Sequence, residues 1–398
     1  MILENIVKHK QTRPPQKRSL NNNSMLQWLL MIASCIVLFW GSIQSIEKEV
    51  TKDEIAAVGT GFQIFHNLGG GEKFAIVQPP LPGIMSYTIL SSTYQLQNIA
   101  AIPSGNYFDM VSFIFALETP KVIGNEILLS VDEENFKKIR YVNLLLVVTI
   151  LYIISRKNIS LVTILAITLY PFTDILMTGT TEALSGLLVM LLLDGMISSM
   201  SYVKFTIVGL IIGLLIATAG TSGMILAGAA ILSQIVFIDI KEKRLSKGFK
   251  REWVIGTFLI FITATTIAWI CYGMDLACYC QLESLLGLEP SSSIRIVPFF
   301  DSMKQTLFDI IFSTNDHKYS FSENVSNFFN RYNIIIAALN VFFAIKKLSH
   351  YGIFSLVSLF CIFLYNDSQM ELIRSFFDTI SIVLTITLTL QLKDYIKS

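Results

Sequence analysis

Two short groups of residues with the capacity for chemistry follow the first apolar run of this chain. Asp53 and Glu54 form an acidic pair, and Gln78-Pro79-Pro80-Leu81 comes later in the same polar segment. Carboxylates are costly to bury in a membrane protein and are retained where catalysis or ion binding needs them. As an alternative, Asp53 and Glu54 could cap the first turn of a loop helix, because acids favour helix N-termini.

The composition of the chain indicates a membrane protein. Of its 398 residues, 53% are hydrophobic and 15% are charged, and the mean hydropathy is +0.60. A soluble domain rarely has such a composition. The net charge of +1 gives no indication of nucleic-acid binding, and the four histidines are scattered along the chain rather than grouped as metal ligands.

Apolar segments recur along the chain, and many approach the length of about 20 residues that a bilayer requires. The first, Met25–Ile46, follows a basic tail at 1–24 and is expected to be an uncleaved anchor. The further expected spans are Ile139–Ser155, Ile159–Pro171, Ala183–Ser199, Phe205–Ala217, Gly223–Ile238, Trp253–Tyr272, Ile334–Phe343, Ile353–Tyr365 and Phe376–Leu392. A Gly-rich break at 218–223 separates two of them. The sequence thus predicts an all-α, polytopic helical bundle of about ten spans.

The charges of the connecting loops predict the orientation of the bundle. With the N-terminus inside, every short cytoplasmic loop carries Lys or Arg, as the positive-inside rule requires. Two long loops, 47–138 and 273–332, would then be extracytoplasmic and would carry short interfacial helices. The expected units are the tail, a core at 25–272 that includes the first loop, the second loop, and C-terminal helices at 333–398. The predicted localisation is the plasma (inner) membrane, as a multi-pass protein.

Three features on the expected outer side occur in an informative order. They are the Asp53-Glu54 pair, the Pro79-Pro80-Leu81 turn, and a stretch that leads from Tyr170-Pro171-Phe172 to Glu182. This order resembles the polytopic GT-C glycosyltransferases, especially the protein mannosyltransferase and aminoarabinose transferase relatives, over residues 1–240, which include the Gly-rich break. The resemblance implies an inverting hexosyl- or pentosyltransferase that uses a polyprenyl-phosphate sugar and a lipid, glycan or protein acceptor.

The resemblance also implies residue roles. Asp53 resembles the catalytic carboxylate of the family, with Glu54 beside it as a helper or metal-facing group. The expected substrate-binding residues are Gln78, Pro79, Pro80, Glu182, Arg295, Lys304 and Arg374. The three cations would stabilise the leaving phosphate, or would instead contact lipid headgroups or solvent. Glu182 could equally cap a helix together with a neighbouring threonine. No metal ligand is assigned, and a divalent metal such as Mg²⁺ or Mn²⁺ is left open.

One departure from the family concerns the residue before the Pro-Pro turn. Some relatives carry an acidic residue and a basic residue there, and the basic residue meets the lipid phosphate. Here Val77-Gln78 occupies the place. Glutamine can hydrogen-bond a phosphate but cannot neutralise its charge. The charge must then be met elsewhere, the donor must differ, or the chain must be a non-catalytic relative.

Two other functions share the predicted topology. A transporter or flippase of lipid-linked glycans would be expected to place charges within its spans, whereas the predicted spans are almost uncharged and the acids lie in the outer loops. A polymerase of lipid-linked glycans differs only in the order of the acidic pair and the Pro-Pro turn. The leading interpretation is the glycosyltransferase, with the sugar donor, membrane lipids and the acceptor as partners.

Overall fold

The computed structural model describes residues 22–49, 51, 54, 57, 80–91, 133–179, 181–196, 201–242, 251–271, 334–364 and 370–396. In these residues the chain forms 11 α-helices and one short 3-10 helix. The elements are α1 (Asn22–Ile46), α3 (Pro80–Ser91), α5 (Glu133–Ser155), α6 (Ile159–Leu169), η2 (Tyr170–Phe172), α7 (Thr173–Thr178), α8 (Glu182–Met196), α9 (Tyr202–Glu242), α10 (Arg251–Cys271), α14 (Ile334–Lys346), α15 (His350–Leu364) and α16 (Met370–Ile396). The predicted all-α fold class is confirmed for this part of the chain.

Four stretches of helix are long and apolar enough to cross a membrane. These candidate spans are Met25–Ile46, Phe136–Ser155, Ile159–Thr178 and Tyr202–Gly220. They indicate an integral, multi-pass membrane protein. A helix also overlaps each of the ten segments expected from the sequence, but the further apolar stretches Ser222–Phe237, Ile255–Ala268, Ile334–Lys346 and His350–Phe360 are shorter than a full span. The count of ten spans therefore stays a prediction.

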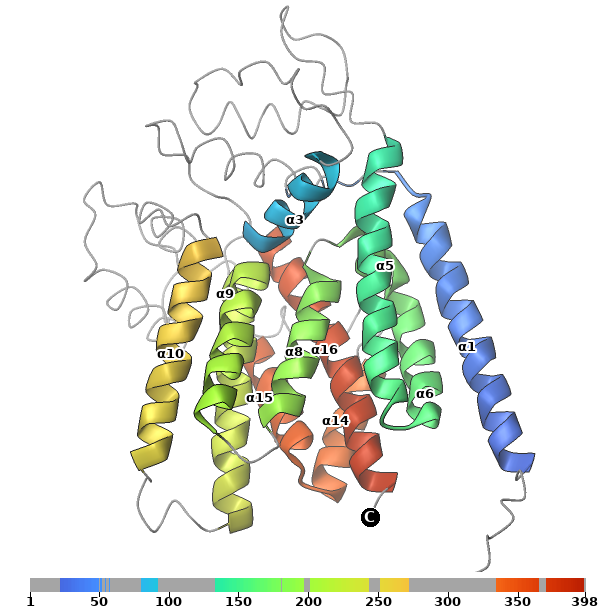
Figure 1. The fold of residues 1–398 in the computed structure, drawn as a ribbon. Helices are drawn as coiled ribbons and strands as arrows, with labels where there is room; N and C mark the ends of the chain where they lie inside the picture. The colour runs from blue at the N-terminus through green and yellow to red at the C-terminus, as the bar shows by residue number, and fades with distance from the viewer. Residues whose placement is uncertain are drawn as a thin grey trace, which may run out of the picture.

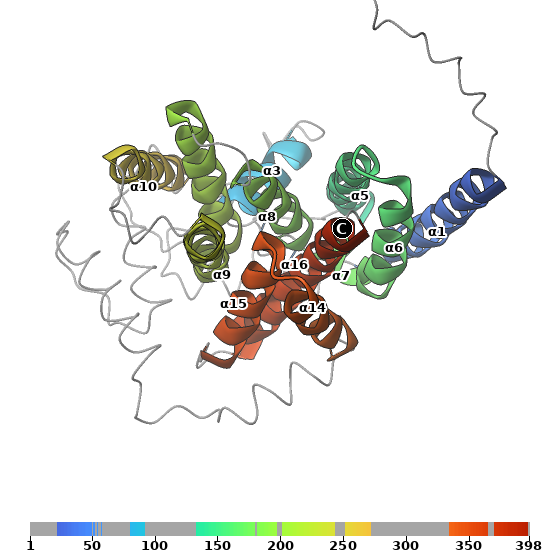
Figure 2. The ribbon, with the colours of Figure 1, turned by 90° about the horizontal axis from the view of Figure 1, so that it is seen from below.

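The helices stand side by side in one bundle (Figure 1). Viewed from below, α1 and α10 lie at opposite edges of the bundle and α16 lies near its middle (Figure 2). The start of α1 and the end of α16 are at the same end of the bundle, which we call the inner end. At the opposite, outer end, α3 lies across the bundle and contacts α5 and α9.

The central helix α16 is enclosed by its neighbours. Every residue from Thr379 to Gln391 is buried, and the helix packs on α6, α8, α14 and α15. A helix enclosed in this way must satisfy its polar groups internally. The hydroxyls that donate to the carbonyl four residues earlier belong to Ser381, Thr385, Thr387 and Thr389. These four buried hydroxyl groups thus bond to the backbone of their own helix.

A neutral polar cluster joins the three C-terminal helices. Asn340 of α14 donates from Nδ2 to the carbonyl of Leu384 in α16, at 3.1 Å. Its Oδ1 accepts from Ser355 Oγ at 2.8 Å and from Gln391 Nε2 at 2.9 Å. All three polar side chains are buried. Such interhelical hydrogen bonds fix the register of helices where water is excluded.

The long helix α9 reverses direction at Gly220. This residue has φ 52° and ψ −124°, a positive-φ conformation that favours glycine. A Cβ at Gly223 would overlap the carbonyl of Leu215, although residues at this spacing are about 12 Å apart in a straight helix. The predicted Gly-rich break at 218–223 is therefore confirmed, and the two halves of α9 form a hairpin.

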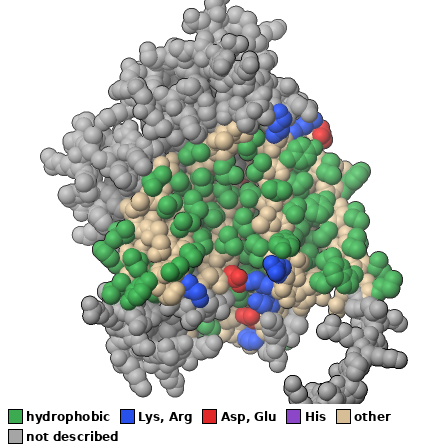
Figure 3. Space-filling model, viewed as in Figure 1, with side chains coloured by type: hydrophobic (Ala, Val, Ile, Leu, Met, Phe, Trp, Pro, Cys, Tyr) green, Lys and Arg blue, Asp and Glu red, His purple; other side chains and the backbone are tan. Residues whose placement is uncertain are grey.

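Large apolar side chains cover the outside of the bundle. Figure 3 shows them in a broad band, with charged side chains gathered toward the two ends of the described surface. On α1, the side chains of Ile36 and Trp40 are 61% and 63% exposed. Extended apolar surface is unusual for a protein in water and suits contact with lipid. The surface therefore agrees with the composition of the candidate spans.

Two glycines bring α9 and α10 into close contact. A Cβ at Gly209 would lie 2.8 Å from the carbonyl oxygen of Ile260, and a Cβ at Gly213 would lie 2.7 Å from that of Ala264. Small residues four positions apart allow membrane helices to approach closely and to pack backbone against backbone. The close crossing of α9 and α10 therefore requires glycine at both positions.

We predict that Gly213→Ala lowers the free energy of unfolding by roughly 1–3 kcal/mol, because the added methyl group pushes α10 away from α9. The matched control is Gly228→Ala, in the same helix. A Cβ at Gly228 meets nothing within 4 Å, so this change should leave stability unchanged or raise it slightly. Thermal unfolding of the two purified variants in detergent makes the comparison, and equal midpoints would contradict the close contact.

Candidate functional site

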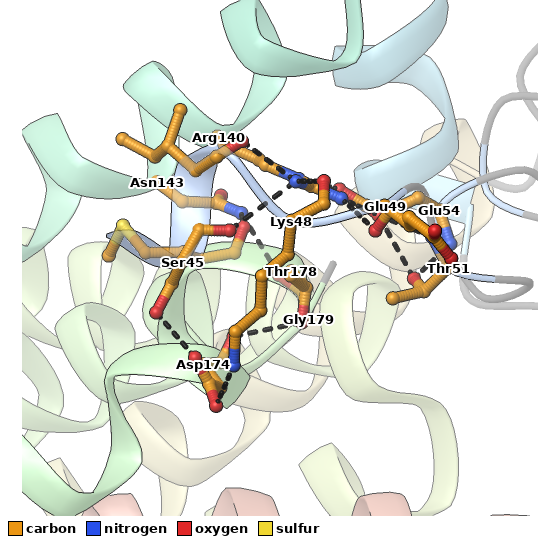
Figure 4. A network of polar contacts seen from close by, with 12 residues as sticks. Ser45, Lys48, Glu49, Thr51, Glu54, Arg140, Asn143, Asp174, Thr178 and Gly179 are labelled. Atoms are coloured by element: carbon orange, nitrogen blue, oxygen red, sulfur yellow. Dashed lines mark hydrogen bonds and ion pairs between the residues drawn. The ribbon is translucent and has the colours of Figure 1, made fainter. Parts of the chain in front are cut away.

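A buried ion pair between Arg140 and Glu54 lies at the outer end of the bundle (Figure 4). Arg140 Nε donates to Glu54 Oε1 at 2.6 Å, and Nη2 donates to Oε2 at 2.7 Å. Each side chain is only 1% exposed. The backbone N–H and the hydroxyl of Thr51 donate to the same carboxylate, at 2.8 and 3.0 Å. Both oxygens of Glu54 are therefore engaged, and the carboxylate is held in one position.

Arg140 also closes the C-terminal end of α1. Its Nη1 donates to the carbonyls of Ile46 and Lys48, at 2.8 and 2.5 Å. Its Nη2 donates to the carbonyl of Glu49 at 2.9 Å. The last carbonyls of a helix have no partner within the helix and carry partial negative charge, which a cation stabilises. One guanidinium group thus joins α5, the end of α1 and the segment that follows it.

Asn143 lies one turn further along α5 and holds a second segment. Its Nδ2 donates to the carbonyl of Met177 at 2.8 Å and to that of Gly179 at 3.0 Å. Gly179 joins α7 to α8, and a Cβ there would overlap the carboxylate of Glu182. The glycine is therefore required where the chain passes close to this acid.

Glu182 is the first residue of α8 and is buried. Its Oε2 accepts from the backbone N–H of Thr181 at 3.1 Å. Burial, together with the nearby charge of Asp378, raises the pKa of Glu182 to about 7. Glu182 begins α8, and this helix starts at the outer end of the bundle (Figure 1). A carboxyl group with a pKa in this range can gain or lose a proton near neutral pH.

A third carboxylate at the outer end is paired with a cation at the surface. Asp174 of α7 accepts from Ser45 Oγ and from Lys48 Nζ, each at 2.5 Å. The side chains of Lys48 and Asp174 are about half exposed. Exposed ion pairs contribute little to stability, but this one links the end of α1 to α7. It stands beside the buried Arg140 network in Figure 4.

The predicted site residues fall into two groups. Those outside the described residues are Asp53, Gln78, Pro79, Arg295 and Lys304. Those within them are Glu54, Glu182, Pro80, which begins α3, and Arg374, which lies in the first turns of α16. The helix α3 and the start of α8, which is Glu182, lie at the outer end of the bundle (Figure 1), and Glu54 binds Arg140 near the start of α5 at the same end. Their catalytic or binding roles stay predictions.

Sequence reasoning missed the residues that organise this end of the bundle. Arg140 and Asn143 were counted only as part of the span Ile139–Ser155. A signal was present, because an arginine inside an apolar run requires a partner and faces the interior of the protein. Its partner could not be found from the sequence, since Glu54 lies on the far side of a long loop.

No group of three or more His, Cys, Asp or Glu side chains in the described part of the chain is arranged to hold a metal ion. Comparisons with protein-family models, with curated proteins and with solved structures each find no match to this chain. The structure therefore supports a helical protein with four candidate membrane spans, and the family resemblance seen in the sequence stays a hypothesis.

We predict that Arg140→Met lowers the free energy of unfolding by about 3–5 kcal/mol, because it leaves the Glu54 carboxylate buried without its partner. The control is Lys137→Met. Lys137 also lies on α5 and binds Glu47 at 2.6 Å, but at the surface, so its loss should cost at most about 1 kcal/mol. Thermal unfolding in detergent measures both.

The double variant Arg140→Met with Glu54→Leu separates the ion pair from the capping of α1. Removal of both charges should recover part of the lost stability, while the α1 carbonyls stay without their donor. A double variant no more stable than Arg140→Met alone would show that the ion pair is not the source of the loss.

Proposed function

We propose that this protein is a membrane glycosyltransferase that transfers a sugar from a polyprenyl-phosphate donor at the outer end of its bundle. One observation carries the proposal. Through Arg140 and Asn143, α5 binds the segment that contains Glu54 and the segment that leads to Glu182. The same helix contacts α3, which begins at Pro80. Parts of the three features that are distant in the sequence are thus joined by one helix.

Asp53 is the proposed catalytic base. Both oxygens of Glu54 are taken up by Arg140 and Thr51, so Glu54 serves to position the segment rather than to accept a proton. Adjacent Cα atoms in a chain are about 3.8 Å apart. Asp53 directly precedes this anchored residue in the sequence, and we propose that the anchor serves to position it. A base must be held within hydrogen-bond reach of the hydroxyl that it deprotonates.

The proposed reaction is a single displacement at the anomeric carbon. Asp53 takes the proton of an acceptor hydroxyl, and the hydroxyl oxygen forms a bond to the anomeric carbon. The bond from that carbon to the phosphate oxygen breaks on the opposite face, so the configuration inverts. The polyprenyl phosphate leaves with the bonding electrons and gains negative charge, which cationic groups must stabilise. Arg295, Lys304 and Arg374 are the proposed cations.

The proposal includes ten spans, with both termini and the basic loops on the cytoplasmic side. A reporter fused after Lys250, between α9 and α10, should therefore give a cytoplasmic signal, because this loop is rich in Lys and Arg. A reporter inserted in the loop 273–332 should give an extracytoplasmic signal. An extracytoplasmic signal after Lys250 would contradict the proposed topology.

We predict that Asp53→Asn lowers turnover by about 10²–10⁴-fold, because the amide cannot accept the proton. The assay is transfer of label by purified protein in lipid, with a panel of radiolabelled polyprenyl-phosphate sugars. Thermal unfolding should be nearly unchanged in this variant. Unchanged transfer by a monodisperse Asp53→Asn protein would remove Asp53 from the mechanism.

Glu54→Gln serves as the comparison for Asp53→Asn. It keeps the shape of the side chain but removes the charge that faces Arg140, so thermal stability should fall clearly. Turnover per folded molecule should fall less than in Asp53→Asn. The opposite ranking of the two variants would make Glu54 the base and would contradict the positioning role.

A further inference from the structure

Lys48, which follows α1 at the outer end of the bundle, is held through both its backbone and its side chain. Arg140 Nη1 donates to the carbonyl of Lys48 at 2.5 Å. Lys48 Nζ donates to Asp174 Oδ2 at 2.5 Å, and Oδ1 of the same carboxylate accepts from Ser45 Oγ at 2.5 Å. The Lys48 side chain therefore runs from the Arg140 network to α7, as Figure 4 shows, and its ammonium group has a defined position.

The ammonium group of Lys48 is open to a further acceptor. A lysine ammonium carries three N–H donors, and Asp174 accepts from one of them. The side chain of Lys48 is 54% exposed. By comparison, the side chain of Lys137 is 25% exposed and that of Arg140 is 1% exposed. Lys48 is therefore the most accessible of these three outer cations.

An exposed apolar surface begins one helical turn inward from this ammonium group. Gly41 lies one turn before Ser45 on α1, which runs toward the outer end (Figure 1). A Cβ at Gly41 would lie 2.9 Å from Cε2 of Tyr170, so the tyrosine ring packs on α1 at this level. Tyr170 is 43% exposed, and Trp40, beside Gly41, is 63% exposed. A cation next to exposed apolar side chains suits a lipid with an anionic head and an apolar chain.

From this arrangement we propose that the Lys48 ammonium group binds the phosphate of a polyprenyl-phosphate lipid. The identity of the lipid rests on the proposed function, which requires a cation for the charge on the leaving phosphate. Gln78 cannot supply that charge, whereas Lys48 can. The ion pair with Asp174 is compatible with this role, because in protein kinases a lysine held by a glutamate binds the phosphates of ATP.

The test is equilibrium binding of radiolabelled polyprenyl phosphate to the full-length protein in detergent, with labelled polyprenol of the same chain length as the uncharged comparison. Lys48→Met should weaken binding of polyprenyl phosphate at least about tenfold, because it removes a hydrogen bond between two charged groups. It should leave polyprenol binding unchanged. The matched control is Lys137→Met, which removes another outer cation and should bind both lipids as the wild type does. Lys48→Met should fold, since its ion pair is half exposed.

A wild type that binds no polyprenyl phosphate, or a Lys48→Met protein with wild-type affinity, would overturn the phosphate contact. So would an equal loss of polyprenol binding, which would indicate a structural defect. Excess phosphatidylglycerol and inorganic phosphate should fail to displace the labelled lipid. Displacement by either would identify an ordinary headgroup or free phosphate as the ligand and would overturn the proposal.

The transferase assay separates this inference from the proposed function. Binding that depends on Lys48, without sugar transfer by the wild type, would leave the phosphate contact standing and would remove the transferase. Transfer by Lys48→Met with the wild-type KM for the donor would remove the phosphate contact and leave the transferase standing.

Discussion

The outer end of this bundle depends on one buried guanidinium group. Arg140 is the second residue of an apolar segment, where the burial of an unpaired charge would cost a large amount of free energy. The guanidinium group is stabilised by the carboxylate of Glu54 and by carbonyls at the end of α1, and these carbonyls have no partner within their own helix. Arg140 thus neutralises the buried carboxylate and donates hydrogen bonds to the last carbonyls of α1. Because these contacts come from three separate segments, the ion pair fixes where the first outer loop leaves the bundle.

The described C-terminal helices are joined by neutral groups. They are linked through the side chains of Asn340, Ser355 and Gln391, and four hydroxyls of α16 bond to its own backbone. A carrier for a charged lipid-linked glycan would need ionisable groups along its path. In the described spans, charged side chains are concentrated near the ends of the bundle instead.

The helices could largely be predicted from the sequence, because their apolar segments have the length and boundaries that lipid requires. The hairpin of α9 was also predictable, since a Gly-rich break interrupts an otherwise continuous run. The residue that pairs with the buried acid Glu54 could not be predicted from the sequence. Arg140 lay within a predicted span, where periodicity alone does not show which side chain it contacts. Its partner Glu54 is far away in the sequence, and only the folded bundle brings the two together.

Three acids at the outer end are compensated in different ways, and the difference separates structure from chemistry. Glu54 is buried against arginine, so it is fixed and structural. Asp174 is paired with Lys48 at the surface, where water also solvates both charges. Glu182 is buried and accepts from Thr181 at the start of α8, and burial together with the charge of Asp378 raises its pKa to about 7. Burial thus opposes the charge of Glu182, whereas arginine and lysine stabilise the charges of the other two acids. The outer end therefore combines a rigid clamp with one acid that can exchange a proton near neutral pH.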